Sequence, residues 1–175
     1  GNVPELPDTL TNGNNMFLNC NLLDGTLPVN LPKSLTSATS MFANCWNLTG
    51  NIPELPDTLT SGSYMFSGCS KLTGTIPNLP DTLTGIRGMF NGCSGLTGSI
   101  PDLPPSITDG RETFQDCKNL TGNIPELPDT LTTAYTMFLN CSGLTGVAPT
   151  MPSSLTSYND IFAGTQITNN ETTPW

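Results

Sequence analysis

Six cysteines are the residues of this chain with the widest choice of chemistry, because a thiol can act as a nucleophile, bind a metal or form a disulfide. Each follows a phenylalanine by three positions, and the spacing between them is 25 and then 24 residues: Cys20, Cys45, Cys69, Cys93, Cys117 and Cys141. Equivalent side chains of a regular repeat point in one direction, whereas the Cβ atoms of a disulfide face each other. The spacing therefore favours buried, unpaired thiols beside the phenylalanines, with disulfides and metal binding as the alternatives.

Acidic residues form a second recurring set, and aligned carboxylates could bind calcium through several oxygen ligands. They lie close to prolines in successive copies of the pattern: Glu5, Asp8, Glu54, Asp57, Asp81, Asp102, Glu126 and Asp129. The alternative is that an aspartate beside a proline begins a turn and keeps the surface soluble. Because Lys33, Pro105 and Ser153 interrupt the aspartate row, we favour turns and predict no metal or cofactor site.

Histidine is absent, and the formal net charge is −9. The sequence thus lacks the commonest general base and any His-dependent triad, so we predict no catalytic residue. With only five lysines and arginines, the chain cannot neutralise a phosphate backbone, which excludes nucleic acid as a partner. No apolar run approaches the roughly 20 residues of a membrane span, so we expect no membrane insertion by this segment.

These residues recur because the chain is built from one repeat. All seven phenylalanines occupy equivalent positions: Phe17, Phe42, Phe66, Phe90, Phe114, Phe138 and Phe162. A unit of 24 residues cannot bury its apolar side chains alone, so neighbouring units must stack and share a core. We predict a single solenoid domain over 1–175 with about seven coils, its repeats running from about residue 4 to 168 and a degenerate terminal repeat at 157–175.

The apolar pattern of one copy predicts its local structure. Between residues 65 and 72, apolar residues fall at i, i+1, i+4 and i+7, which indicates a short helical turn. Alternation from Leu72 to Ile76, stopped by Pro77, indicates a short strand that pairs in parallel with its counterparts. The inward-facing candidates of this copy are Met65, Phe66, Cys69, Leu72, Ile76, Leu79 and Leu83.

Hydroxyl side chains hold two further fixed positions. A serine or threonine lies eight residues before every phenylalanine, and a threonine lies six residues before it. Hydroxyls at such positions close turns on their own backbone or form ladders between neighbouring strands.

The phrase "DTLTSGSYMFSGCSKLTG" at 57–74 resembles the F-x-x-C-x-x-L unit of bacterial surface leucine-rich repeats of the BspA-like class. The resemblance covers residues 4 to about 168 and implies an α/β repeat solenoid with short parallel strands and short helical turns. It also implies a secreted or cell-surface protein that binds host proteins, matrix or other cells. "NLTGNIP" at 47–53 is similar to plant-type leucine-rich repeats as well. The regular I-P-x-L-P differs from the usual strand of the BspA-like class, which leaves the strand boundaries open.

Binding residues are expected where the copies differ, just before each Met-Phe pair. Tyrosine and arginine, which are frequent binding anchors, concentrate in this variable segment. The small or apolar residue that precedes each variable pair, such as Ala38, Ile86 or Ala134, is expected to point inward. The alternative is that these positions are simply unconstrained solvent sites. The candidate ligand-binding residues are Tyr64, Arg87, Arg111, Glu112, Tyr135, Tyr158 and, at an otherwise polar position, Trp46.

The sequence thus predicts a non-enzymatic binding or adhesion module of a secreted or cell-surface bacterial protein. Its expected partner is a host or bacterial surface protein or a glycan, recognised through one solenoid face. We expect the export signal and anchor to lie outside this sequence. Two alternatives remain, a parallel β-helix enzyme that degrades polysaccharides and a purely structural surface stalk.

Overall fold

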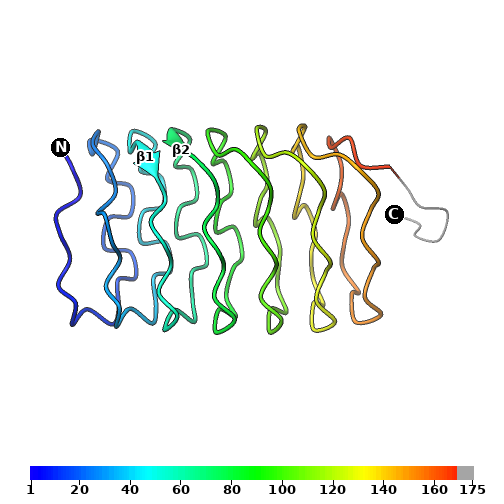
Figure 1. Cartoon of the computed structure of the whole chain (residues 1–175), viewed down its shortest axis with the longest axis horizontal. Coiled ribbons are helices and arrows are strands. Elements are labelled where there is room, and N and C mark those ends of the chain that lie inside the picture. The colour runs from blue at the N-terminus through cyan, green and yellow to red at the C-terminus, as the bar shows by residue number, and fades with distance from the viewer. Residues whose placement is uncertain (169–175) are drawn as a thin grey trace.

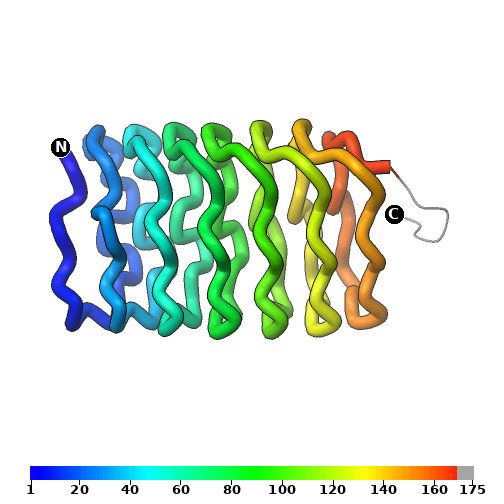
Figure 2. The backbone as a smooth tube through the Cα atoms, in the orientation of Figure 1, coloured from blue at the N-terminus to red at the C-terminus, as the bar shows by residue number. Residues whose placement is uncertain are grey.

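The chain forms one row of stacked coils that runs from the N-terminus to the C-terminal end (Figure 1). The structure, a computed structural model, describes residues 1–168. Every coil follows nearly the same path around the axis (Figure 2), which confirms the predicted repeat solenoid. We name each coil by its phenylalanine. The last part of the predicted terminal repeat, 169–175, lies outside the described residues.

Short parallel pairings join the coils along one edge. Strand β1 (Gly50–Asn51) pairs in parallel with β2 (Leu72–Thr73), and single bridges connect later coils at the same part of the repeat. This pairing confirms the strand that begins at Leu72. Both strands are only two residues long, and the glycines at this part of the repeat, Gly50 within β1 and Gly74 after β2, have φ values of 82° and 79°, outside the β region.

A second ladder was not predicted as a strand. It joins the residues five positions before each phenylalanine by parallel bridges, from coil to coil along almost the whole molecule: Asn12, Ser37, Ser61, Gly85, Asp109, Thr133 and Ser157. This ladder lies immediately before the variable segment, so it fixes the backbone from which the candidate binding residues project.

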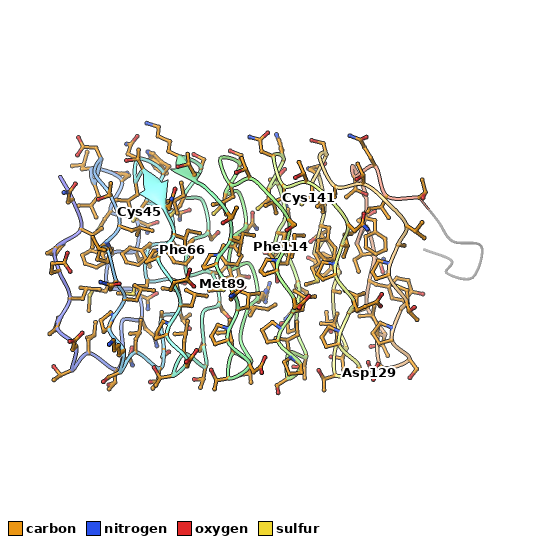
Figure 3. All side chains as sticks on the ribbon, viewed as in Figure 1. Cys45, Phe66, Met89, Phe114, Asp129 and Cys141 are labelled. Carbon is orange, nitrogen blue, oxygen red and sulfur yellow. The ribbon has the colours of Figure 1, made fainter. Side chains whose placement is uncertain are left out.

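The core is a set of identical rows that run along the axis. All seven inward-facing candidates of the Phe66 coil are buried, with relative exposures between 0% and 7%. The phenylalanine rings stack with centroids 5.4–6.0 Å apart and planes within 17° of parallel. Phe66 and Phe114 occupy the interior in Figure 3, level with one another. Stacked, offset rings add to the apolar burial of each coil.

The predicted helical turn is wrong, since no residue between 1 and 168 is helical. Instead, successive backbone amides donate alternately to carbonyls of their own coil and to carbonyls of the next coil. The amides of Met65, Ser67 and Cys69 donate to carbonyls three residues earlier in their own coil, at 2.9–3.1 Å. Those of Phe66 and Gly68 donate to the next coil, at 3.0 and 2.7 Å. Apolar residues at this spacing can therefore face a core from successive turns as well as from a helix. Accordingly, nothing in the described part of the chain is a helix able to cross a membrane.

Two left-handed residues in each of the seven coils explain why no helix forms. One lies two residues before the phenylalanine and the other two residues after it, and we call them the pre-Phe and post-Phe residues. In the Phe66 coil they are Tyr64, with a φ of 56°, and Gly68, with a φ of 77°. A right-handed helix cannot contain such residues at every fourth position.

The predicted hydroxyl ladders are present between coils. The Oγ1 of Thr58 donates to the carbonyls of Lys33 and Leu35 at 2.7 and 2.9 Å, and that of Thr60 donates to the Thr36 carbonyl at 3.0 Å. The same bonds recur in later coils, for example at Thr82. The Thr58 hydroxyl thus serves carbonyls that receive no amide within the described residues, whereas the Thr36 carbonyl also accepts the amides of Thr60 and Ser61.

Candidate ligand-binding surface

The cysteines are packing and hydrogen-bonding residues of the core. All six are free, and Cys69 and the next cysteine along the row, Cys93, are fully buried. The Cys69 Sγ donates to the Phe42 carbonyl at 3.1 Å, and each cysteine from Cys45 to Cys141 repeats this bond one coil further on. Burial raises the pKa of the Cys69 thiol to about 12. A buried thiol that stays protonated cannot serve as a nucleophile at neutral pH.

The acidic row lies near the turns at the edge of the solenoid opposite β1 and β2, where Figure 3 shows Asp129. The aspartate positions belong to the backbone turns: the Asp57 carbonyl, for example, accepts the Thr82 hydroxyl at 2.8 Å. Over residues 1–168, no three or more Cys, Asp or Glu side chains come together in a way that could hold a metal ion. These observations agree with the turn interpretation of the aspartates.

Three of the predicted binding residues come together although they belong to three different coils. The Arg87 guanidinium lies 5.5 Å from the centre of the Tyr64 ring. Its Nη2 also donates to Glu112 Oε1 at 3.2 Å. Glu112 accepts a longer bond from the Tyr64 hydroxyl, at 3.5 Å. A cation over an aromatic face and a charge-assisted hydrogen bond therefore link the Phe66, Phe90 and Phe114 coils on the surface.

The Tyr64 ring crosses the intervening coil because that coil has a glycine beneath it. Gly88 is the pre-Phe residue of the Phe90 coil, and a Cβ built on it would lie 2.3 Å from Tyr64 Cε1. Only glycine fits under the ring at this position. Burial of Tyr64, together with the neighbouring Glu112 carboxylate, raises the pKa of its hydroxyl, so the ring stays neutral.

Arg111 extends the cluster through a residue that the sequence analysis missed. Its Nε and Nη2 donate to the two oxygens of Asp109, at 2.9 and 2.6 Å. Burial alone would raise the pKa of Asp109, but its bonds to Arg111 lower it below the usual value. The available signal was the spacing, since residues two apart on a strand face the same side.

Backbone strain accompanies the cluster. Tyr64 and Glu112 are both pre-Phe residues with left-handed backbone, at φ values of 56° and 60°. Thr136, the pre-Phe residue of the next coil, has a φ of 53°, and its Oγ1 is buried without a hydrogen-bond partner. Left-handed backbone is unfavourable for side chains other than Gly, Asn and Asp.

The remaining candidates lie apart from one another. Tyr135 is adjacent to the cluster, with a relative exposure of 39%, and its carbonyl accepts the Glu112 amide at 3.3 Å. Tyr158 occupies the inward position of its coil, where Ala38, Ile86 and Ala134 are buried as predicted, and it packs against the core. Trp46 is 47% exposed but follows Cys45, on a different part of the repeat.

Comparison with known proteins supports the repeat assignment. Residues 4–121 and 75–173 match the family described as BspA type leucine rich repeat region, in six copies. The chain also matches a crystal structure of a leucine-rich repeat protein from Bacteroides ovatus, with 19% sequence identity and a TM-score of 0.47. The match covers 89% of this chain and 52% of that protein, so the chain spans about half its length. A search of curated proteins found no match. The chain belongs to the BspA-type leucine-rich repeat family.

Proposed function

We propose that this chain is a non-enzymatic binding module of a secreted or cell-surface bacterial protein. The proposed binding site is the anchor surface, which consists of Tyr64, Arg87, Asp109, Arg111, Glu112 and Tyr135. Leucine-rich repeats of this family are typically binding modules without catalytic activity, in agreement with this role. The partner would be a host or bacterial surface protein or a glycan.

The observation that carries the proposal is the linked set of Tyr64, Arg87 and Glu112. The repeat itself does not require these residues, because other coils have Ser40 or Asn15 where this part of the chain has Tyr64 and Glu112. Two of the three are nevertheless held in unfavourable left-handed backbone. Side chains that bear strain without serving the core are expected at functional sites.

The enzyme alternative lacks comparable support. Both carboxylates of the anchor surface, Asp109 and Glu112, are paired with arginines, so neither is a free acid or base. Although Asp109 is partly buried, its bonds to Arg111 hold its pKa below the usual value, whereas a general acid needs a raised pKa.

Removal of the anchor side chains tests the proposal. The variant Tyr64→Ala, Arg87→Ala, Arg111→Ala and Tyr135→Ala should lose most binding of the labelled 175-residue chain to arrays of matrix proteins, bacterial surface proteins and glycans. Lys118→Ala is the control, because it removes an exposed positive charge outside the anchor surface. A structural stalk would be favoured if the quadruple variant binds as well as wild type, or if the wild-type chain binds nothing on any of these arrays.

A further inference from the structure

We infer that the ligand of the anchor surface is an uncharged oligosaccharide that lies along the solenoid axis across the Phe66 to Phe138 coils. This inference rests on the proposed function and specifies the class of ligand. It follows from the charge, the hydrogen-bonding groups, the aromatic rings and the arrangement of the same six residues.

The charges of the anchor surface cancel. Arg87 and Arg111 are each paired with a carboxylate, from Glu112 and Asp109 respectively. An acidic ligand would have to compete with those carboxylates for the guanidinium groups, in a chain whose net charge is −9. A basic ligand would find carboxylates that are already paired, while the acidic row near the turns, which joins no ion pair among residues 1–168, would attract it more strongly. A neutral ligand meets neither obstacle.

Donors and acceptors are held next to each other. The Arg111 fork binds Asp109 through two contacts, and Arg87 binds Glu112 through one, so guanidinium nitrogens and carboxylate oxygens lie about a hydrogen bond apart. A hydroxyl group both donates and accepts. Neighbouring hydroxyls of a sugar ring can thus bond to both members of each pair without breaking the pair.

An exposed aromatic ring completes the match to a sugar. Tyr135 is 39% exposed in the coil that follows Glu112, whereas the Tyr64 ring is covered by Arg87 and lies over Gly88. The face of an aromatic ring carries partial negative charge and attracts the weakly positive C–H groups of a sugar face. Polar pairs next to an exposed aromatic ring suit an oligosaccharide, whose rings have an apolar face and a polar rim.

The arrangement is linear and fixed before binding. Coils of a parallel ladder are about 4.8 Å apart, so Tyr64 and Tyr135, three coils from each other, span roughly 14 Å along the axis. Gly88 beneath Tyr64, the two ion pairs and the left-handed backbone of Glu112 restrict the side chains in the absence of ligand. Ordering that precedes binding reduces the entropy lost when the ligand binds.

Titration with paired oligosaccharides tests the inference. The probes are short oligomers of glucose, galactose, mannose and N-acetylglucosamine, each paired with a counterpart that carries uronate or sulfate groups. We expect at least one neutral oligomer to bind the 175-residue chain about tenfold more tightly than its acidic counterpart. Tyr135→Ala should weaken that binding about tenfold, whereas Tyr135→Phe, which keeps the ring, and the Lys118→Ala control should not.

The possible outcomes separate this inference from the proposed function. The inference is overturned if the chain prefers an acidic oligomer, or if it binds proteins but no neutral oligomer. The proposed function still stands in that case, provided that anchor-surface variants abolish the binding of the acidic oligomer or protein. Neutral oligomers that bind all anchor variants as tightly as wild type would overturn both. Circular dichroism and thermal melting confirm that each variant keeps the fold.

Discussion

The two left-handed residues that flank each phenylalanine share a backbone conformation but differ in side chain. The post-Phe residues are all of types that tolerate this conformation: Asn19, Asn44, Gly68, Gly92, Asp116, Asn140 and Gly164. The pre-Phe residues are Asn15, Ser40, Tyr64, Gly88, Glu112, Thr136 and Asp160, and four of them, Ser40, Tyr64, Glu112 and Thr136, are of types that do not. The backbone therefore determines the residue type after the phenylalanine, whereas another requirement determines it before the phenylalanine.

Packing explains part of this difference. On the post-Phe side the cysteine row and the phenylalanine row are buried, and two pairs of neighbouring post-Phe residues bond to each other: Asn44 Nδ2 donates to Asn19 Oδ1 at 2.8 Å, and Asn140 Nδ2 donates to Asp116 Oδ1 at 2.9 Å. On the pre-Phe side the side chains reach the surface and contact residues one or two coils away, as Tyr64 contacts Arg87 and Glu112. Contacts on the post-Phe side recur along the row of cysteines, whereas contacts on the pre-Phe side bridge particular coils.

Alkaline pH should have the largest effect, and it acts through the post-Phe side. Burial raises the pKa of Cys45 to about 11 and those of Cys69 and Cys141 to about 12, from an ordinary value of 9.0. Below pH 9.0 these thiols are protonated in the folded and the unfolded state, so they do not make stability depend on pH. Above pH 9.0 the thiols of the unfolded state lose their protons first. Each thiol should then lower the free energy of unfolding by about 1.4 kcal/mol per pH unit, up to its folded pKa.

Urea unfolding followed from neutral pH to about pH 11 measures this slope. The matched comparison is Cys93→Ala, which lacks one buried thiol but keeps all lysines and tyrosines. Its slope should be shallower than that of wild type by the contribution of one thiol. Equal slopes would show that the thiols ionise as readily in the folded chain as in the unfolded one.

Alanine at the two left-handed glycines that flank Phe90, Gly88 and Gly92, compares both sides directly. Gly92→Ala should lower stability by about 1–2 kcal/mol, because φ is 74° but the nearest atoms to a new Cβ are 3.6 Å away. Gly88→Ala should lower it by roughly 1–3 kcal/mol more, because its Cβ would displace the Tyr64 ring. Thermal and urea unfolding of the two variants measure the difference.

The double variant Gly88→Ala/Tyr64→Ala is the control for this pair. When Tyr64 is already alanine, the loss of stability caused by Gly88→Ala should fall to that caused by Gly92→Ala in the wild-type chain. If Gly88→Ala and Gly92→Ala are equally destabilising, the Tyr64 ring does not depend on the space above Gly88.

Exchanging threonine and asparagine between the pre-Phe residue Thr136 and the post-Phe residue Asn140 should change stability least, with opposite signs at the two positions. Thr136→Asn should raise stability by about 0.5–1 kcal/mol, because asparagine accepts a φ of 53° and the unpartnered buried hydroxyl is removed. Asn140→Thr should lower stability by about 1–2 kcal/mol, since it puts a β-branched residue at a φ of 61° and removes the bond to Asp116. Melting temperatures of both variants check the signs; a gain at both sites would contradict the comparison.

The core could be predicted from the sequence because its signal is repeated in every copy. The inward position of Phe66, Leu72 and Leu83 follows from periodicity alone, and so does the parallel pairing after Leu72. The helical turn was mispredicted because apolar spacing does not distinguish a helix from successive turns. The distinguishing signal was the row of Asn, Gly and Asp after each phenylalanine, which indicates left-handed backbone.

The candidate site could be predicted only as a region. Variability before each Met-Phe pair identified Tyr64, Arg87 and Glu112, but not that the Tyr64 side chain crosses the intervening coil to reach Glu112. That contact depends on the size of Gly88, a residue of the coil between them. Asp109 was missed because it belongs to the ladder position, where other coils have Ser61 or Gly85.

The direction of the backbone bonds between coils has a mechanical consequence. The amides of Phe66 and Gly68 point along the solenoid axis to the next coil, as do their equivalents elsewhere. A pull on the two ends stretches these bonds lengthwise and loads every coil equally, but a terminal coil has a neighbour on one side only, so it peels away before an interior coil yields. Each step releases one unit of about 24 residues of slack chain. Under tension such a rod lengthens in equal increments at nearly constant force, as an extensible tether does, instead of breaking at a single point.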